Sequence, residues 1–132
     1  MAHSPYPDFA WTVGFDAEVP CVAMTWQGYA TSRAFREANE QIVAVIAKHK
    51  TAKMLADVKH FVLIGAEDQT WLAADWIPRA MAAGMTIVAM VLPTFHFNRV
   101  AIANVAEKLD PGRLMLRFFA DREDARAWLR TG

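Results

Sequence analysis

Seven side chains of this 132-residue sequence have the types and the spacing to form a small polar site. They are Asp57, Lys59, His60, Thr94, His96, Asn98 and Arg99. The first three stand at the end of one apolar run, and the other four follow a second apolar run. If both runs are parallel strands, their carboxyl ends meet at the edge of the sheet where α/β proteins usually bind ligands. The sequence therefore predicts a ligand-binding site at this edge.

The set is compatible with more than one kind of chemistry. Asp57, His60 and His96 could hold a metal as a facial set, or Asp57 could orient His60 as a general base. Arg99 and a helix that begins at Asn98 could instead bind an anion or another small ligand. The sequence has no HExxH, GxSxG or glycine-rich phosphate loop. We therefore expect no catalytic residue, metal or cofactor, and a small enzyme using these three residues remains an alternative.

The run Thr86–Leu92, TIVAMVL, is the element on which the second group of residues depends. It is almost entirely apolar, and β-branched residues fill its first half, which favours a strand buried on both faces. Gly84 precedes it and Pro93 ends it. We expect it to be the central parallel strand of the sheet.

The remaining elements follow from alternating or helical spacing of the apolar residues. The pattern predicts an antiparallel hairpin of two strands, three further strands and four helices, in the order β-β-α-β-α-β-α-β-α. The predicted strands are 9–15, 21–26, 54–58, 86–92 and 113–119, and the predicted helices are 32–49, 66–83, 99–109 and 122–130. Residues 59–65 are predicted as a loop, and Pro78 predicts a kink near residues 75–77.

Composition limits the classes of protein that fit. Fourteen basic and fourteen acidic residues cancel, and neither sign is clustered, so the sequence lacks the basic surface of a nucleic-acid binder. No apolar run approaches the roughly 20 residues that span a bilayer. The single cysteine, Cys21, lies in an apolar strand and is interpreted as a buried small side chain. We expect a cytoplasmic protein with a flexible lead-in at residues 1–8 and one domain at 9–132.

The second predicted helix is apolar on nearly all of its faces. Trp71, Trp76 and Met81 follow one another at intervals of five residues, so they cannot share one narrow stripe. They are candidates for an interface with a second copy of the chain or for a lid over an apolar ligand. We expect a homodimer.

Several local stretches resemble a known family. They are 31–38 (TSRAFREA), 67–71 (EDQTW), 76–80 (WIPRA), 91–93 (VLP) and 118–129 (FFADREDARAWL). With the order of the elements, they resemble the STAS domains, in particular the small bacterial proteins called SpoIIAA-like. The resemblance implies an α/β, STAS-like mixed sheet of about five strands with a leading antiparallel hairpin, parallel inner strands and four helices. It also implies a non-enzymatic regulatory module that acts through protein–protein contacts.

The sequence departs from one feature of the phosphorylation-regulated STAS domains. In those proteins, a serine or threonine follows the third strand's aspartate at the start of the second helix. Here Asp57 is followed by Val58-Lys59-His60-Phe61, and no hydroxyl occurs before Thr70. A phosphate-dependent switch therefore has no residue to act on at this place. A more distant resemblance to the CRAL-TRIO lipid-binding fold implies an alternative function, binding of a small apolar or lipid-like ligand beneath the helices.

Overall fold

The computed structural model describes residues 2–3, 9–61, 65–92, 96–110 and 112–131, with the backbone alone at residues 2–3 and 96–98. Its strands form one sheet whose spatial order is the chain order, β1-β2-β3-β4-β5-β6. The strands are β1 (Ala2–His3), β2 (Phe9–Asp16), β3 (Cys21–Gly28), β4 (Lys53–Phe61), β5 (Ile87–Val91) and β6 (Met115–Phe119). The first two pairs, β1 with β2 and β2 with β3, are antiparallel, and the remaining pairs are parallel.

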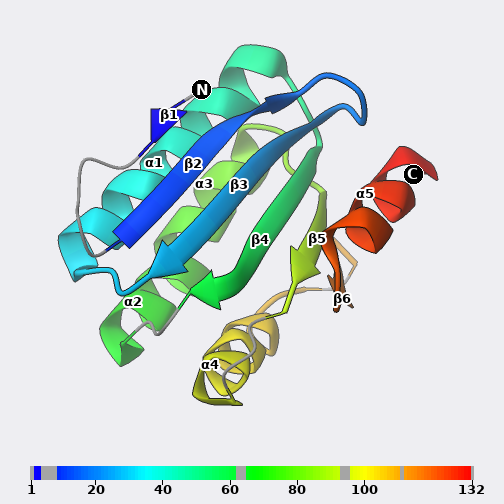
Figure 1. The fold of residues 1–132 in the computed structure, drawn as a ribbon. Coiled ribbons are helices and arrows are strands. Elements are labelled where there is room, and N and C mark those ends of the chain that lie inside the picture. The colour runs from blue at the N-terminus through cyan, green and yellow to red at the C-terminus, as the bar shows by residue number, and fades with distance from the viewer. Residues whose placement is uncertain (1, 4–8, 62–64, 93–95, 111, 132) are drawn as a thin grey trace.

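Helices cover the two faces of this sheet unequally (Figure 1). They are α1 (Ser32–His49), α2 (Ala66–Trp71), the π-helical η1 (Leu72–Trp76), α3 (Ile77–Ala82), α4 (His96–Ala106) and α5 (Arg122–Thr131). The larger core lies between the sheet and the helices α1, α3 and α4. A smaller core lies between the sheet and α5, around Leu55, Ala89 and Leu129. The mixed sheet, the leading hairpin, the parallel inner strands and the four predicted helical regions are confirmed.

Local sequence explains where several helices begin and end. The side chain of Thr31 accepts a hydrogen bond from the Ala34 N–H at 3.2 Å and caps α1, and Lys50 ends it in the left-handed conformation (φ 51°). Asp121 caps α5 by accepting from the Glu123 N–H at 2.8 Å. Gly84, at φ 126°, turns the chain from α3 toward β5.

The second helical region is irregular ahead of Pro78, where the sequence predicts a kink. The backbone N–H of Ile77 donates to the carbonyl of Leu72, five residues earlier, which is the π-helical pattern. In a regular α-helix the ring of Pro78 would collide with the carbonyl of the residue four positions earlier. The wider π turn lets the helix continue past the proline, so the chain forms three consecutive segments, α2, η1 and α3.

Several boundaries differ from the prediction, and one strand is added. β4 continues to Phe61, because Phe61 pairs with Gly28 and its ring packs 5.2 Å from that of Trp26, so residues 59–61 are strand and not loop. The helix predicted to begin after Asn98 already begins at His96, so Asn98 lies in its first turn and is not its cap. The pairing of Ala2–His3 with β2 adds a strand that residues 1–8 gave no signal for. β6 begins only at Met115.

The strand predicted at Thr86–Leu92, β5 in the structure, is not at the centre of the sheet. β5 has a neighbour on each side, β4 and β6, but it lies next to the edge strand β6, and the middle of the sheet is formed by β3 and β4. Both faces of β5 are nevertheless covered, by α4 on one side and α5 on the other, through Val88 and Ala89 respectively.

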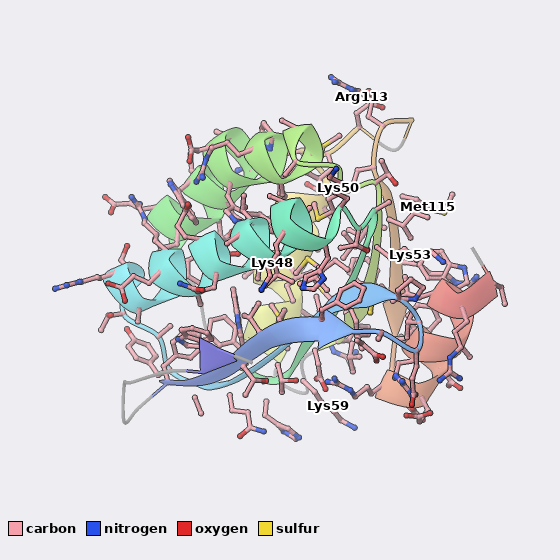
Figure 2. All side chains as sticks on the ribbon, turned by 90° about the horizontal axis from the view of Figure 1, so that it is seen from above. Lys48, Lys50, Lys53, Lys59, Arg113 and Met115 are labelled. Atoms are coloured by element: carbon pink, nitrogen blue, oxygen red, sulfur yellow. The ribbon has the colours of Figure 1, made fainter. Side chains whose placement is uncertain are left out.

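The start of β4 is tied to the end of the last helix. Figure 2 shows Lys53 extending toward α5, and its Nζ donates to the carbonyl of Leu129. This contact satisfies a helix-terminal carbonyl and places a positive charge at the negative end of the helix dipole.

Candidate functional site

Asp57, the first residue of the predicted polar site, is held by the last helix. Nη1 of Arg122 donates to Oδ2 of Asp57 at 3.1 Å and to Oγ1 of Thr25 at 2.9 Å. The backbone N–H of Lys59 donates to the other carboxylate oxygen at 3.3 Å. Asp57 is therefore a half-buried anchor that joins α5 to β3 and β4.

The remaining residues of that predicted site are spread over a strand and a helix. Lys59 and His60 lie on β4, where Lys59 is half-buried and His60 is exposed. Arg99 is exposed on α4. Thr94 and the side chains of His96 and Asn98 lie outside the described residues, so the convergence of the two groups stays a prediction. Within the described part of the chain, no group of three or more His, Cys, Asp or Glu side chains could hold a metal ion.

The three residues predicted to form an interface or lid have different environments. Trp76 is only 4% exposed, and its Nε1 donates to the backbone carbonyl of Asn39 at 2.7 Å. Trp71 is half-buried, with the guanidinium of Arg36 5.0 Å from the centre of its ring. Met81 is half-buried as well. Trp76 thus belongs to the core, while Trp71 and Met81 are partly accessible.

Beneath these helices lies a cavity of about 100 Å³. Its walls come from β3, β4 and β5 on one side and from α1, η1, α3 and α4 on the other. Prominent lining residues are Trp26, Met54, Val58, Trp76, Ala101 and Val105. Elements from nearly the whole length of the chain therefore line one partly open space, which lies where an apolar ligand beneath residues 71–81 would bind.

The chemistry of the lining is almost wholly apolar. Among the lining residues that the structure describes, none has an ionisable side chain, and Asn39 is the single amide. Its Nδ2 donates to the carbonyl of Phe35 at 3.0 Å, so part of its hydrogen-bonding capacity is already used within α1. Burial of a charge without a partner is costly, so this space suits an uncharged ligand.

Trp26, Asn39 and Ala101 line the cavity but were not predicted as functional residues. The sequence does contain a signal for Trp26. Trp26 and Met24 are two residues apart and therefore lie on the same face of the hairpin strand, the face that packs against the core. Ala101 and Val105 share one side of α4 by their spacing of four residues. Neither pattern reveals a cavity, because core residues have the same spacing whether or not the packing between them is complete.

A polar contact fastens the outer end of the cavity's helical cover. Asp68, which is 8% exposed in the first turn of α2, accepts a hydrogen bond from Oγ of Ser32 at 2.7 Å. Nε of Arg36 lies 3.3 Å from the same carboxylate oxygen. These contacts join α2 to the first turns of α1. We call this group, Ser32, Arg36 and Asp68, the helix latch.

A second polar cluster lies on the opposite face of the sheet, at the hairpin turn. Arg126 of α5 donates to Oδ2 of Asp16 at 3.0 Å and to Oε2 of Glu18 at 3.1 Å. Burial alone would raise the pKa of Asp16. The hydrogen bonds from Arg126 and from the Glu18 amide, together with the charge of Arg126, outweigh burial and lower it.

The arrangement of strands and helices agrees with a comparison of the sequence with protein families. The model of the family described as SpoIIAA-like matches residues 21–130. The chain belongs to the SpoIIAA-like family. This assigns it to the STAS-like α/β domains, which in general are regulatory or binding modules. A search of curated proteins finds no match to the chain. Within the described residues, no helix is long and apolar enough to cross a membrane.

Proposed function

We propose that this SpoIIAA-like domain is a non-enzymatic binding module whose ligand is a small, uncharged, apolar molecule. The observation that carries the proposal is the apolar cavity of about 100 Å³ between the sheet and the helices. Protein interiors are packed nearly as densely as organic crystals, so a void of this size leaves its lining without contact partners. A ligand that fills it recovers those contacts.

The size of the cavity limits the ligand. An engineered cavity of about 150 Å³ lined by apolar side chains stays dry and binds benzene or xenon. The cavity here, about 100 Å³, suits a compact ligand or one end of a longer lipid-like molecule. Leu72 and Trp76 of η1 belong to its cover. π-Helical turns within α-helices are frequent at functional sites, and η1 agrees with a cover that adjusts to an entering ligand.

The test is a titration of the full chain with benzene, followed by two-dimensional amide NMR. We expect saturable shifts of amides around the cavity, in β3, β4 and α4. Ala101→Leu places three additional carbon atoms into the cavity and should weaken benzene binding by about tenfold or more. Ala103→Leu makes the same change at an exposed position of the same helix and should leave binding unchanged.

Absence of saturable binding to the wild-type chain would contradict the proposal. Equal weakening of benzene binding by Ala101→Leu and Ala103→Leu would also contradict it, because Ala103 is not among the residues that line the cavity.

A second candidate function is regulation through protein–protein contacts. It is favoured by a shallow surface depression over α1 and α2, lined by Arg36, Ala66, Glu67, Thr70 and Trp71. This surface includes a residue of the helix latch, so a partner bound there would contact the cover of the cavity. The third alternative, a small enzyme using Asp57, His60 and His96, gains no support among the described residues, because Asp57 is engaged by Arg122.

A further inference from the structure

We infer that the ligand of the cavity carries a hydrogen-bond acceptor, such as a carbonyl or ether oxygen, that binds the indole N–H of Trp26. This inference rests on the proposed function and specifies its ligand class. Trp26 lies on β3, lines the cavity and is 4% exposed. Among the described residues, its Nε1 has no hydrogen-bond partner. A buried donor without an acceptor costs about 1–3 kcal/mol, so native proteins rarely leave one.

The surroundings of Trp26 restrict where an acceptor can come from. The rings of Phe9, Phe35 and Phe61 pack around it, with centroids 5.7, 5.2 and 5.2 Å from that of its own ring. Aromatic rings offer at most a weak N–H···π contact. The cavity adjoins Trp26 and is a space in which a bound molecule could place an oxygen atom near the indole.

The second buried indole that lines the cavity already has a hydrogen-bond acceptor. Trp76 also lines the cavity, but its Nε1 donates to the carbonyl of Asn39 at 2.7 Å. A water molecule beside Trp26 would be a poor substitute for a ligand, since buried water typically needs about three polar partners. The lining residues of the cavity offer few such partners. An apolar molecule with one acceptor satisfies both the lining and the indole.

Two probes of nearly the same shape separate the acceptor from the apolar contact. Cyclohexanone carries a carbonyl oxygen where methylenecyclohexane carries a CH₂ group. We expect Trp26→Phe to weaken cyclohexanone binding by roughly tenfold, the loss of one hydrogen bond, while methylenecyclohexane changes by less than about twofold. For each probe, the affinity for the variant is compared with the affinity for the wild type. The different water solubilities of the two probes therefore do not affect the result.

Trp11→Phe is the matched control. The Nε1 of Trp11 is also buried, with no hydrogen-bond partner in the described part of the chain. Trp11 is the cross-strand neighbour of Trp26 but is not among the residues that line the cavity. We expect this variant to bind both probes as the wild type does. A second measurement needs no variant: cyclohexanone should shift the indole N–H proton resonance of Trp26 downfield in the wild-type chain, and methylenecyclohexane should not.

The outcomes separate this inference from the proposed function. If both probes bind but Trp26→Phe weakens them equally, or the indole resonance moves equally with both, the acceptor inference is wrong and apolar binding stands. If neither probe binds the wild-type chain, the proposed function fails and the inference fails with it.

Discussion

At the level of single residues, the fold changes the chemistry of Cys21. This thiol is completely buried in β3 beneath α5. Burial, and to a smaller extent the charge of Asp16, raise its pKa to about 11. Because the thiolate is the reactive form, the folded chain should protect Cys21 from alkylation. The interpretation of Cys21 as a buried apolar side chain agrees with its position.

We therefore expect iodoacetamide to modify Cys21 slowly in the native protein at mildly alkaline pH. Modification should become fast in concentrated urea, where the thiol has its ordinary pKa and is accessible. Intact-mass spectrometry over time measures both rates. Similar rates in the two conditions would show that Cys21 is accessible in the folded chain.

The Asp16 carboxylate should make stability depend on pH. Its pKa is lowered in the folded chain, so the contribution of its ionised form is present above the unfolded value of about 3.9. This contribution to stability is lost as the pH falls through the lower pKa that Asp16 has in the folded chain. Asp16→Asn should therefore lower the urea midpoint near neutral pH, and its difference from wild type should shrink below about pH 4.

Glu107→Gln, at an exposed position beyond the end of α4, is the control for this experiment. It should change the urea midpoint little at either pH. A difference between Asp16→Asn and wild type that stays constant over the acidic range would show that the Arg126 contact does not carry the effect.

At the level of elements, helical and alternating patterns predicted most of the architecture. The predicted helix 32–49 coincides with α1, because Phe35, Ala38, Ile42 and Ile46 form one buried stripe and Thr31 caps it. The predicted boundaries were wrong where tertiary contacts determine the end of an element. β4 extends through Lys59 and His60 because Phe61 is held in an aromatic cluster formed by distant strands and α1.

The helix latch should stabilise the cover of the cavity locally. Asp68→Ala removes the acceptor shared by Ser32 and Arg36. We expect it to lower the opening free energy of α2 by about 1 kcal/mol, because both former partners can turn to solvent. Hydrogen exchange followed by NMR should show faster exchange in α2, while amides of β4 keep their protection.

Glu67→Ala is the matched control, since Glu67 is an exposed carboxylate in the same helical turn. Both substitutions remove a negative charge from the amino end of α2, an effect of about 0.3–1 kcal/mol that they share. The difference between them reports the latch. Equal effects of the two substitutions would mean that the latch contributes nothing.

At the level of the whole molecule, the sheet edge formed by β6 is left without a pairing strand in the described part of the chain. β6 has a strand on one side only, and its residues Met115 and Phe118 are 56% and 39% exposed. Figure 2 places Met115 at this margin of the molecule. Native proteins usually protect such an edge from pairing with another chain. A second copy of the chain would protect it, in addition to any contact through Trp71 and Met81.

We therefore expect light scattering to give a mass near twice 14.8 kDa. Met115→Lys should reduce that mass if β6 forms the contact, because a charge on an edge strand opposes pairing. Met81→Lys should reduce it instead if the helical surface forms the contact. A mass near 14.8 kDa for the wild type at high concentration would exclude self-association as part of the function.

The sequence by itself determined the kinds of element, their order from β2 onward, the caps of α1 and α5, the disturbance ahead of Pro78 and the family. These depend on spacing along the chain, which is local information. Tertiary structure alone decided that Arg122 holds Asp57 across 65 positions, that Trp76 bonds to Asn39, and that the walls around Trp26 leave a cavity. The physical reason is that the periodicity of apolar residues indicates only which side chains face the core. Whether they fill the space depends on the volumes and distances of residues far apart in sequence.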